Sequence, residues 1–170
     1  ELLRAKGVAV VEGVLGEECA ELNLIFNHWI VRAAPLLALK VASTLDGKLT
    51  LPVGQGRAIT GPEAQAYVHH LRRLFPAIAV SADTALADNP RLTARDGDGE
   101  TCPIRFVLDR HFKTAGRTGL NLFQDAHRTR TIVVGLGSSA KKSDLSWYEA
   151  EGIKVWGLVG DEDSFLKVWA

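Results

Sequence analysis

Lys40 is the first residue of the chain whose surroundings suggest chemistry. It lies in the apolar run 36–42, among alanine, leucine and valine residues. The run is short, which favours a buried strand over a helix. Because an unpaired buried ammonium group is costly, its side chain must reach water, an anion or a ligand. Two interpretations stay open: a contact to substrate at the carboxyl end of a sheet, or a lysine whose charge reaches solvent along a buried stem.

Several arginines are spaced so that they could bind a phosphate group. Two end a predicted helix and two lie in a loop that follows it: Arg72, Arg73, Arg91 and Arg95. The guanidinium group is planar and always charged, so it suits phosphate oxygens. The alternative is that each is a solvated surface charge that contributes little.

The histidines and cysteines form no pattern typical of a metal site. His69 and His70 are adjacent on a predicted helix, so their imidazoles point about 100° apart and cannot share one metal ion. Cys19 and Cys102 match neither a metal knuckle nor a CxxC redox pair. We therefore expect no metal ion, and the sequence supports no Ser/His/Asp or Cys/His triad.

A glycine-rich segment follows a predicted strand. Gly135 begins a match to G-x-G-x-x-A that ends at Ala140, and Asp161 follows the next predicted strand. This spacing is found in dinucleotide-binding sites, where the glycines allow the backbone to approach a pyrophosphate. The residues after Ala140 are polar, so a plain glycine turn or a phosphate-contacting loop remains an alternative to a true dinucleotide fingerprint.

Predicted strands alternate with predicted helices, which indicates an α/β fold with a largely parallel sheet flanked by helices. Four apolar segments are predicted strands in the second part of the chain: 77–80, 104–108, 131–134 and 153–159. Helices are predicted around 145–151 and 161–169. Residues 110–130 are expected to be mostly loop.

A helix is predicted between Pro62 and Pro76. Thr60 and Glu63 form a capping box, and Pro62 suits the first helical turn. The remaining expectations are less regular elements: a short strand over 7–15, a helix over 16–30, a short strand over 48–53, and a loop with one helical turn over 81–89.

Composition excludes several classes of protein. The 170 residues contain 20 Lys plus Arg and 20 Asp plus Glu, so the formal net charge is zero. A nucleic-acid-binding protein usually shows a basic excess, and none is present. No apolar run reaches the ~18 residues of a membrane span. We expect a cytoplasmic protein without nucleic-acid or membrane partners.

Four motifs in order resemble the riboflavin-biosynthesis pyrimidine reductases. They are Leu-Lys-Val-Ala-Ser-Thr-Leu-Asp-Gly-Lys at 39–48, Ile-Thr-Gly-Pro-Glu-Ala at 59–64, Thr-Ala-Leu-Ala-Asp-Asn-Pro-Arg-Leu-Thr-Ala-Arg at 84–95 and Ile-Arg-Phe-Val-Leu-Asp at 104–109. The resemblance implies a dihydrofolate-reductase-like fold. It also implies NADPH-dependent reduction of the ribosyl group of 5-amino-6-(5-phosphoribosylamino)uracil to ribityl.

The resemblance also implies roles for individual residues. Lys40 matches a catalytic strand lysine that faces substrate. Positions that match substrate contacts are Gly56, Arg72, Leu92 and Arg95, with the arginines placed for the phosphate. Positions that match cofactor contacts are Ala42, Ala58, Thr84, Asp88 and Arg110.

Three departures from the family pattern bear on activity. Gly56 and Ala58 replace the Ser and Trp of the family, and Arg110 replaces a serine. Arg110 either pairs with the NADP 2′-phosphate or clashes with the cofactor. The chain also ends before a Glu-Gly-Gly segment of the family. Two alternatives therefore remain, a catalytically inactive nucleotide-binding module and a related NADPH reductase with another pyrimidine- or pterin-like substrate.

The resemblance implies a two-part organisation. Residues 1–34 resemble the tail and connector of a zinc deaminase domain, and 35–170 resemble a reductase domain that is incomplete at its C-terminal end. The sequence contains no methionine, so we interpret Glu1 as a cut boundary. In the full-length chain the resemblance implies an N-terminal deaminase domain and a homodimer.

Overall fold

A computed structural model of the chain describes residues 1–50, 59–97 and 99–160. Contacts along the chain divide it into two units, Glu1–Ile59 and Thr60–Ala170. Each unit is described by itself below. The predicted strand over 48–53, the predicted helix over 161–169 and the site candidates Gly56 and Ala58 fall wholly or partly outside the described residues.

The first unit contains three short helices: α1 Leu2–Ala5, α2 Gly16–Leu22 and α3 Leu24–Arg32. The single helix predicted over 16–30 is interrupted at Asn23, whose side-chain amide donates to the Cys19 carbonyl at 3.0 Å. The predicted strand over 7–15 is wrong. Gly7 and Gly13 both have positive φ, which interrupts an extended run.

The predicted strand over 36–42 is also wrong. These residues belong to no strand, and Lys40 is exposed. An apolar run becomes a strand only when a neighbouring strand accepts its backbone hydrogen bonds. No such partner exists among the described residues.

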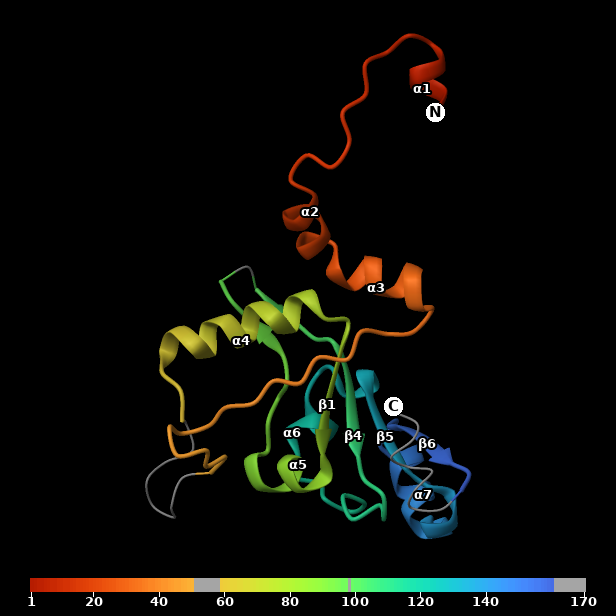
Figure 1. Ribbon diagram of the computed structural model, residues 1–170. Helices are drawn as coiled ribbons and strands as arrows, with labels where there is room; N and C mark the ends of the chain where they lie inside the picture. The colour runs from red at the N-terminus through yellow and green to blue at the C-terminus, as the bar shows by residue number, and fades with distance from the viewer. Residues whose placement is uncertain (51–58, 98, 161–170) are drawn as a thin grey trace. The chain divides into compact units, whose positions relative to one another are not determined.

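The second unit is built on a four-stranded sheet (Figure 1). Its strands are β1 Ala77–Ser81, β4 Ile104–Leu108, β5 Thr131–Leu136 and β6 Lys154–Leu158, in the order β1-β4-β5-β6. Every neighbouring pair is parallel, so the predicted α/β fold with a mostly parallel sheet is confirmed. A separate antiparallel hairpin joins β2 Ala94–Arg95 to β3 Glu100–Thr101.

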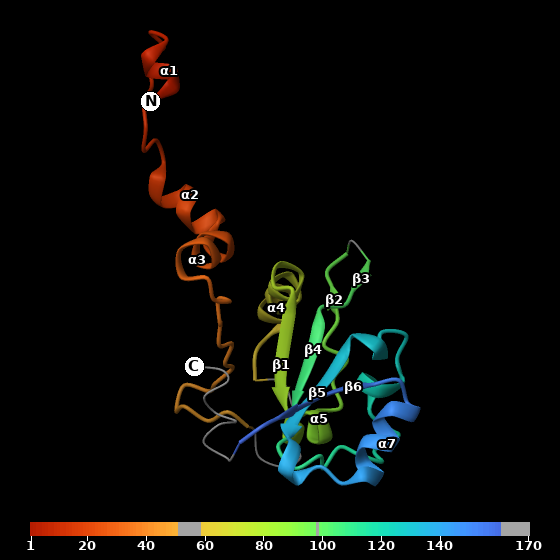
Figure 2. The ribbon, with the colours of Figure 1, turned by 90° about the vertical axis from the view of Figure 1, so that its right-hand side faces the viewer.

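One face of the sheet carries the main core. A row of register partners crosses it, formed by Val80, Val107, Val133 and Val155. Three helices supply the residues that pack against this row: α5 Ala82–Asp88, α6 Asn121–Gln124 and α7 Lys142–Ala150. Figure 2 shows α5 and α7 on the same side of the strands. A smaller cluster on the other face includes Ile132, Val134 and Leu136.

Two helix boundaries differ from their prediction. Helix α4 Pro62–Leu74 is present, but Gly61 is its N-cap and no side chain caps it, so the capping box at Thr60 is wrong. The predicted loop over 81–89 is instead the helix α5. It forms because the Ser81 hydroxyl accepts a hydrogen bond from the Thr84 backbone amide at 3.2 Å and so caps the first turn.

The glycine-rich segment forms a turn. Residues Gly137–Ser139 make one 3₁₀ turn, and α7 begins three residues later. Gly135 is required by packing, because a Cβ atom there would lie 2.5 Å from Phe112 Cζ and 2.7 Å from the Asp109 carbonyl oxygen. Packing therefore accounts for Gly135, and the segment has the form of a turn.

Candidate anion-binding site

Arg72 and Arg95 meet where helix α4 packs against strand β2. Arg72 Nη1 donates to the Thr93 carbonyl at 3.1 Å. His69, one turn earlier on α4, accepts a hydrogen bond at Nδ1 from the backbone amide of Arg95 at 3.1 Å. Two arginines that are far apart in sequence are therefore brought to one place by the last two turns of a single helix.

The electrostatics of this cluster favour an anion. Burial and the neighbouring charge of Arg95 lower the pKa of Arg72. Burial and the charges of both arginines also lower the pKa of His69, which keeps its imidazole neutral and able to accept. Arg72 Nε and Thr93 Oγ1 are buried without a hydrogen-bond partner among the described residues. A phosphate group would neutralise the two cations and accept from such donors.

A second arginine of α4 fixes the hairpin beside the cluster. Arg73 forms an ion pair with Asp96, in which Nε lies 2.9 Å from Oδ2, and Nη2 donates to the Gly99 carbonyl at 3.1 Å. The hydrogen bond from Arg73 holds the pKa of Asp96 below its usual range. Arg73 therefore stabilises the hairpin, whereas Arg72 belongs to the cluster with Arg95 and His69.

Leu92 lies between α5 and this cluster, but its side chain belongs to the core. It is 4% exposed and has φ of 58°, a left-handed conformation that is costly for leucine. The side chain packs in the same cluster as Val107 and Phe123. The predicted contact of Leu92 with substrate stays a prediction.

Two predicted cofactor residues of this unit follow the carboxyl ends of neighbouring strands. Ser81 and Leu108 are register partners at the carboxyl ends of β1 and β4. Thr84 follows the first of these strands and Arg110 the second, so both lie near one edge. Asp88 is at the last turn of α5, and both it and Thr84 are exposed.

Lys40 and Ala42 belong to the first unit, where Lys40 is exposed and Ala42 half-buried. Their predicted roles in catalysis and cofactor binding stay predictions.

Sequence analysis missed Arg105, the largest fully buried side chain described. It lies on β4 and donates to the Asp125 carboxylate at 2.6 and 2.9 Å. The sequence did contain a signal, which is a charged residue inside an apolar run. Arg105 lies in the apolar strand 104–108, just as Lys40 lies in the apolar run 36–42. A cation in such a strand must be paired, and here the partner comes from the loop after α6.

A second buried network lies at the other end of β4. The Asp109 carboxylate accepts from the backbone amides of Lys113 and Thr114, at 3.0 and 2.7 Å, and from the Thr114 hydroxyl at 2.7 Å. The Tyr148 hydroxyl lies 2.8 Å from Thr114 Oγ1. Burial raises the pKa of Tyr148 well above its usual range, so its hydroxyl stays protonated.

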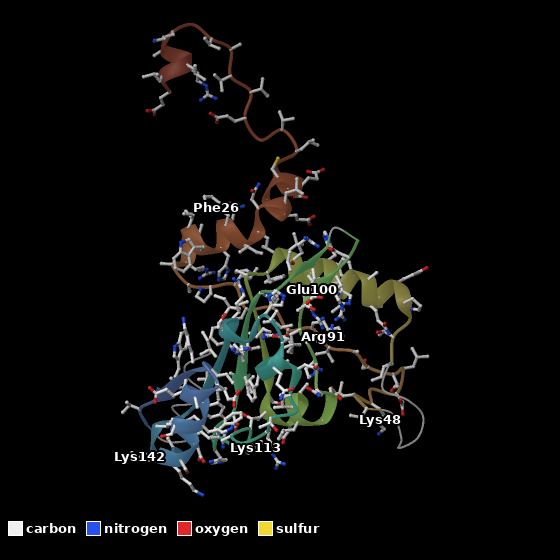
Figure 3. All side chains as sticks on the ribbon, turned by 180° about the vertical axis from the view of Figure 1, so that it is seen from behind. Phe26, Lys48, Arg91, Glu100, Lys113 and Lys142 are labelled. Carbon is white, nitrogen blue, oxygen red and sulfur yellow. The ribbon has the colours of Figure 1, made fainter. Side chains whose placement is uncertain are left out.

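Figure 3 shows how the two ends of the unit are separated. Glu100 on the hairpin and Lys113 in the turn after β4 lie at opposite ends, and Arg91 lies nearer to the hairpin end.

Among the described residues no group of three His, Cys, Asp or Glu side chains could hold a metal ion. No helix in the described part of the chain is long and apolar enough to cross a membrane.

The parallel sheet and its flanking helices define an α/β domain, and Arg72 and Arg95 form a candidate anion-binding cluster in it. The chain belongs to the RibD C-terminal domain family, whose model matches residues 35–156. Curated relatives are the riboflavin biosynthesis proteins RibD of Actinobacillus pleuropneumoniae, 40% identical over 82% of this chain and 36% of the relative, and of Bacillus amyloliquefaciens, 34% identical over 94% and 42%. The chain thus spans less than half the length of these relatives.

Solved structures agree with this assignment. Acinetobacter baumannii RibD is 26% identical with a TM-score of 0.70, over 98% of this chain and 45% of that one. A Thermotoga maritima protein described as a diaminohydroxyphosphoribosylaminopyrimidine deaminase/5-amino-6-(5-phosphoribosylamino)uracil reductase is 32% identical with a TM-score of 0.68, over 95% and 49%. The dihydrofolate-reductase-like fold implied by the sequence motifs is confirmed.

Proposed function

We propose that this chain is the reductase part of a riboflavin-biosynthesis protein. It would reduce the ribosyl group of 5-amino-6-(5-phosphoribosylamino)uracil to ribityl with NADPH. The observation that carries the proposal is the proximity of the Arg72 and Arg95 charges beside a neutral His69. Two neighbouring cations suit one phosphate group, and the Thermotoga relative is named for a phosphoribosyl substrate.

The residues of the chain would bind and orient the two reactants. Arg72 and Arg95 would hold the substrate phosphate, and the open form of the ribose would present its C1′ atom for reduction. NADPH, when bound, supplies the hydride, and a proton from solvent or a side chain completes the reduction. Lys40 remains the candidate for a catalytic contact to the ribose.

The chemistry of the carboxyl edge fits a nucleotide cofactor. Ser81, Thr84 and Asp88 offer hydroxyl and carboxylate groups there, and Arg110 offers a cation suited to the 2′-phosphate of NADPH. Ala42 and Ala58 would complete this part of the site, as the family pattern implies. A deaminase domain in the full-length protein and a homodimer are parts of the same proposal.

The test is NADPH consumption, followed by absorbance, with the pyrimidine substrate and the full-length protein. Arg72→Ala and Arg95→Ala should each raise KM for the substrate by on the order of 10- to 100-fold, because each removes a charge-assisted bond to phosphate. Arg128→Ala, at an exposed arginine of the 3₁₀ turn Arg128–Arg130, is the matched control and should leave KM unchanged.

Different results would favour the alternatives. Binding of NADPH without turnover in the full-length protein would indicate an inactive binding module. Turnover only with another pyrimidine- or pterin-like compound would indicate a related reductase. Equal KM values for Arg72→Ala, Arg95→Ala and Arg128→Ala would contradict the assigned phosphate site.

A further inference from the structure

The segment Asn89–Arg95 joins the two ends of the second unit. It leaves helix α5 near the carboxyl edge and arrives at the arginine cluster through β2. Its backbone is unusual, since Asn89 and Leu92 have φ of 45° and 58°. Left-handed conformations cost free energy for residues other than glycine, so the surrounding structure must hold this segment in place.

Both ends of the segment are anchored by side chains. Asn89 and Asn121 exchange two hydrogen bonds of 2.7 Å, each pairing a side chain with the backbone of the other residue. The Asn89 side-chain amide also donates to the Gly119 carbonyl at 3.0 Å. At the other end, His69 accepts from the backbone amide of Arg95.

Arg105 contacts the segment between these two anchors. Its Nη1 donates to the carbonyl oxygen of Arg91 at 2.9 Å. The rest of the guanidinium is used as well, since Nη2 donates to the Leu122 carbonyl at 3.1 Å and Nε to Thr131 Oγ1 at 3.0 Å. A guanidinium has five N–H donors in a rigid fork, so its contacts cannot shift independently of one another.

Asp125 keeps the guanidinium in this orientation. It accepts from Nη1 and Nη2 together, and its own Oδ1 accepts from the His127 backbone amide at 3.0 Å. Burial alone would raise the pKa of Asp125, but the hydrogen bonds and charge of Arg105 outweigh it and lower the pKa. The pair therefore stays ionised at neutral pH.

We propose that Arg105 is a positioning residue for the anion-binding site. By holding the Arg91 carbonyl against β4 and α6, it fixes the backbone that presents Arg95 to Arg72. Arg105 itself is fully buried, so its guanidinium is not open to an anion at the surface. This inference rests on the proposed function only for the identity of the anion.

The test compares Arg105→Lys with wild type in the full-length protein. Lysine keeps the positive charge but cannot bind Asp125 and the Arg91 carbonyl together. We expect KM for the pyrimidine substrate to rise on the order of 10-fold or more, with kcat changed by less than about twofold, because misplaced binding groups weaken binding. Asp125→Asn loosens the same fork without touching the segment and should act in the same direction.

Val134→Ala is the matched control, because Val134 is buried in the neighbouring strand and packs in the smaller cluster, whereas Leu92 of the segment packs in the main core. It should lower the melting temperature and leave KM unchanged. If Arg105→Lys and Asp125→Asn lower the melting temperature as Val134→Ala does but leave KM unchanged, the role of Arg105 is structural only and the proposal is overturned. If Arg105→Lys does not fold, Asp125→Asn decides alone.

A titration with inorganic phosphate separates this inference from the proposed function. The Nε–H NMR signals of Arg72 and Arg95 should shift on addition of phosphate in wild type, and at higher phosphate concentration in Arg105→Lys. If the wild-type protein binds phosphate but shows no turnover, the proposed function is contradicted. A weaker phosphate affinity of Arg105→Lys would still support the positioning role. Equal phosphate affinities in the two proteins overturn the positioning role, and no binding to wild type overturns both.

Discussion

The two ends of strand β4 carry buried polar side chains that are satisfied in different ways. Near its start, Arg105 is paired with the carboxylate of Asp125 and with carbonyls from Arg91 and Leu122. Directly after its end, Asp109 accepts backbone amides and a hydroxyl, with no ion pair to a cation within the described part of the chain. Backbone N–H groups can stabilise a buried carboxylate, whereas the buried cation here is paired with a carboxylate of opposite charge.

The two networks also differ in what they connect. The bonds of Asp109 reach Lys113 and Thr114 and shape one turn. Those of Arg105 reach back to Arg91 and forward to Asp125 and Thr131, so they join three separate segments. The network at the start of β4 therefore supports the candidate site, and the network at its end holds one turn and connects it to Tyr148 of α7.

The largest expected effect is at the start of β4. Arg105→Ala removes the cation that pairs with the Asp125 carboxylate and the donor to the Arg91 carbonyl, so we expect a loss of about 3–5 kcal/mol in the free energy of unfolding. Urea denaturation of wild type and variant measures it. A loss below that of Tyr148→Phe would remove the distinction between the two networks.

Gly135→Ala tests the packing at the end of β4. Its new methyl group would meet the Phe112 ring and the Asp109 carbonyl oxygen, and backbone atoms cannot move aside cheaply. We expect a loss of about 1–3 kcal/mol, measured by urea denaturation. Gly119→Ala is the matched control, because a Cβ atom there meets nothing within 4 Å. Equal losses for the two variants would show that the close packing around Gly135 is unimportant.

Tyr148→Phe removes one hydrogen bond from the Asp109 network. Thr114 Oγ1 keeps its bond to Asp109, so the network survives and the loss should be about 1 kcal/mol. Tyr67→Phe, at an exposed tyrosine of α4, should leave the unfolding midpoint unchanged. A loss as large as that of Arg105→Ala would mean that the network at the end of β4 is as critical as the one at its start.

The smallest effect concerns pH. The pKa of His69 is lowered in the folded chain, so the unfolded chain takes up a proton first as pH falls below about 6.5. The contribution of His69 to stability should therefore be lost as the pH falls from about 6.5 to the folded pKa, and should be constant above about 6.5. His69→Gln should reduce the difference in melting temperature between pH 5 and pH 7.5, and His70→Gln should not. An unchanged difference in His69→Gln would contradict the prediction.

The parallel sheet was predictable because its strands are short apolar runs bounded by turn residues, as at 104–108 and 131–134. The strand over 36–42 failed because a run of apolar residues does not show whether a pairing strand is present, and most side chains of this run are exposed. Helix α5 was missed because its stability comes from the Ser81 cap and from Ala82 and Ala85 in the core, which local pattern does not display.

The candidate site was predictable only through motifs. Arg72 and Arg95 were named from the family resemblance, and the structure brings them together. His69 was considered only as a metal ligand together with His70. Its bond to the Arg95 amide could not be predicted, because that bond depends on how α4 and β2 pack. Asp125 could not be paired with Arg105 from the sequence, since their contact depends on the loop after α6.

The all-parallel sheet has a kinetic consequence. Each strand pairs with a partner that lies beyond a crossover: Ala77 with Ile104, Arg105 with Thr131 and Ile132 with Lys154. No hairpin between adjacent strands can nucleate this sheet, so loop entropy must be lost before any ladder forms. We therefore expect slow refolding relative to helical domains of the same size. Until the neighbouring strands have paired, exposed strand edges would favour association between chains.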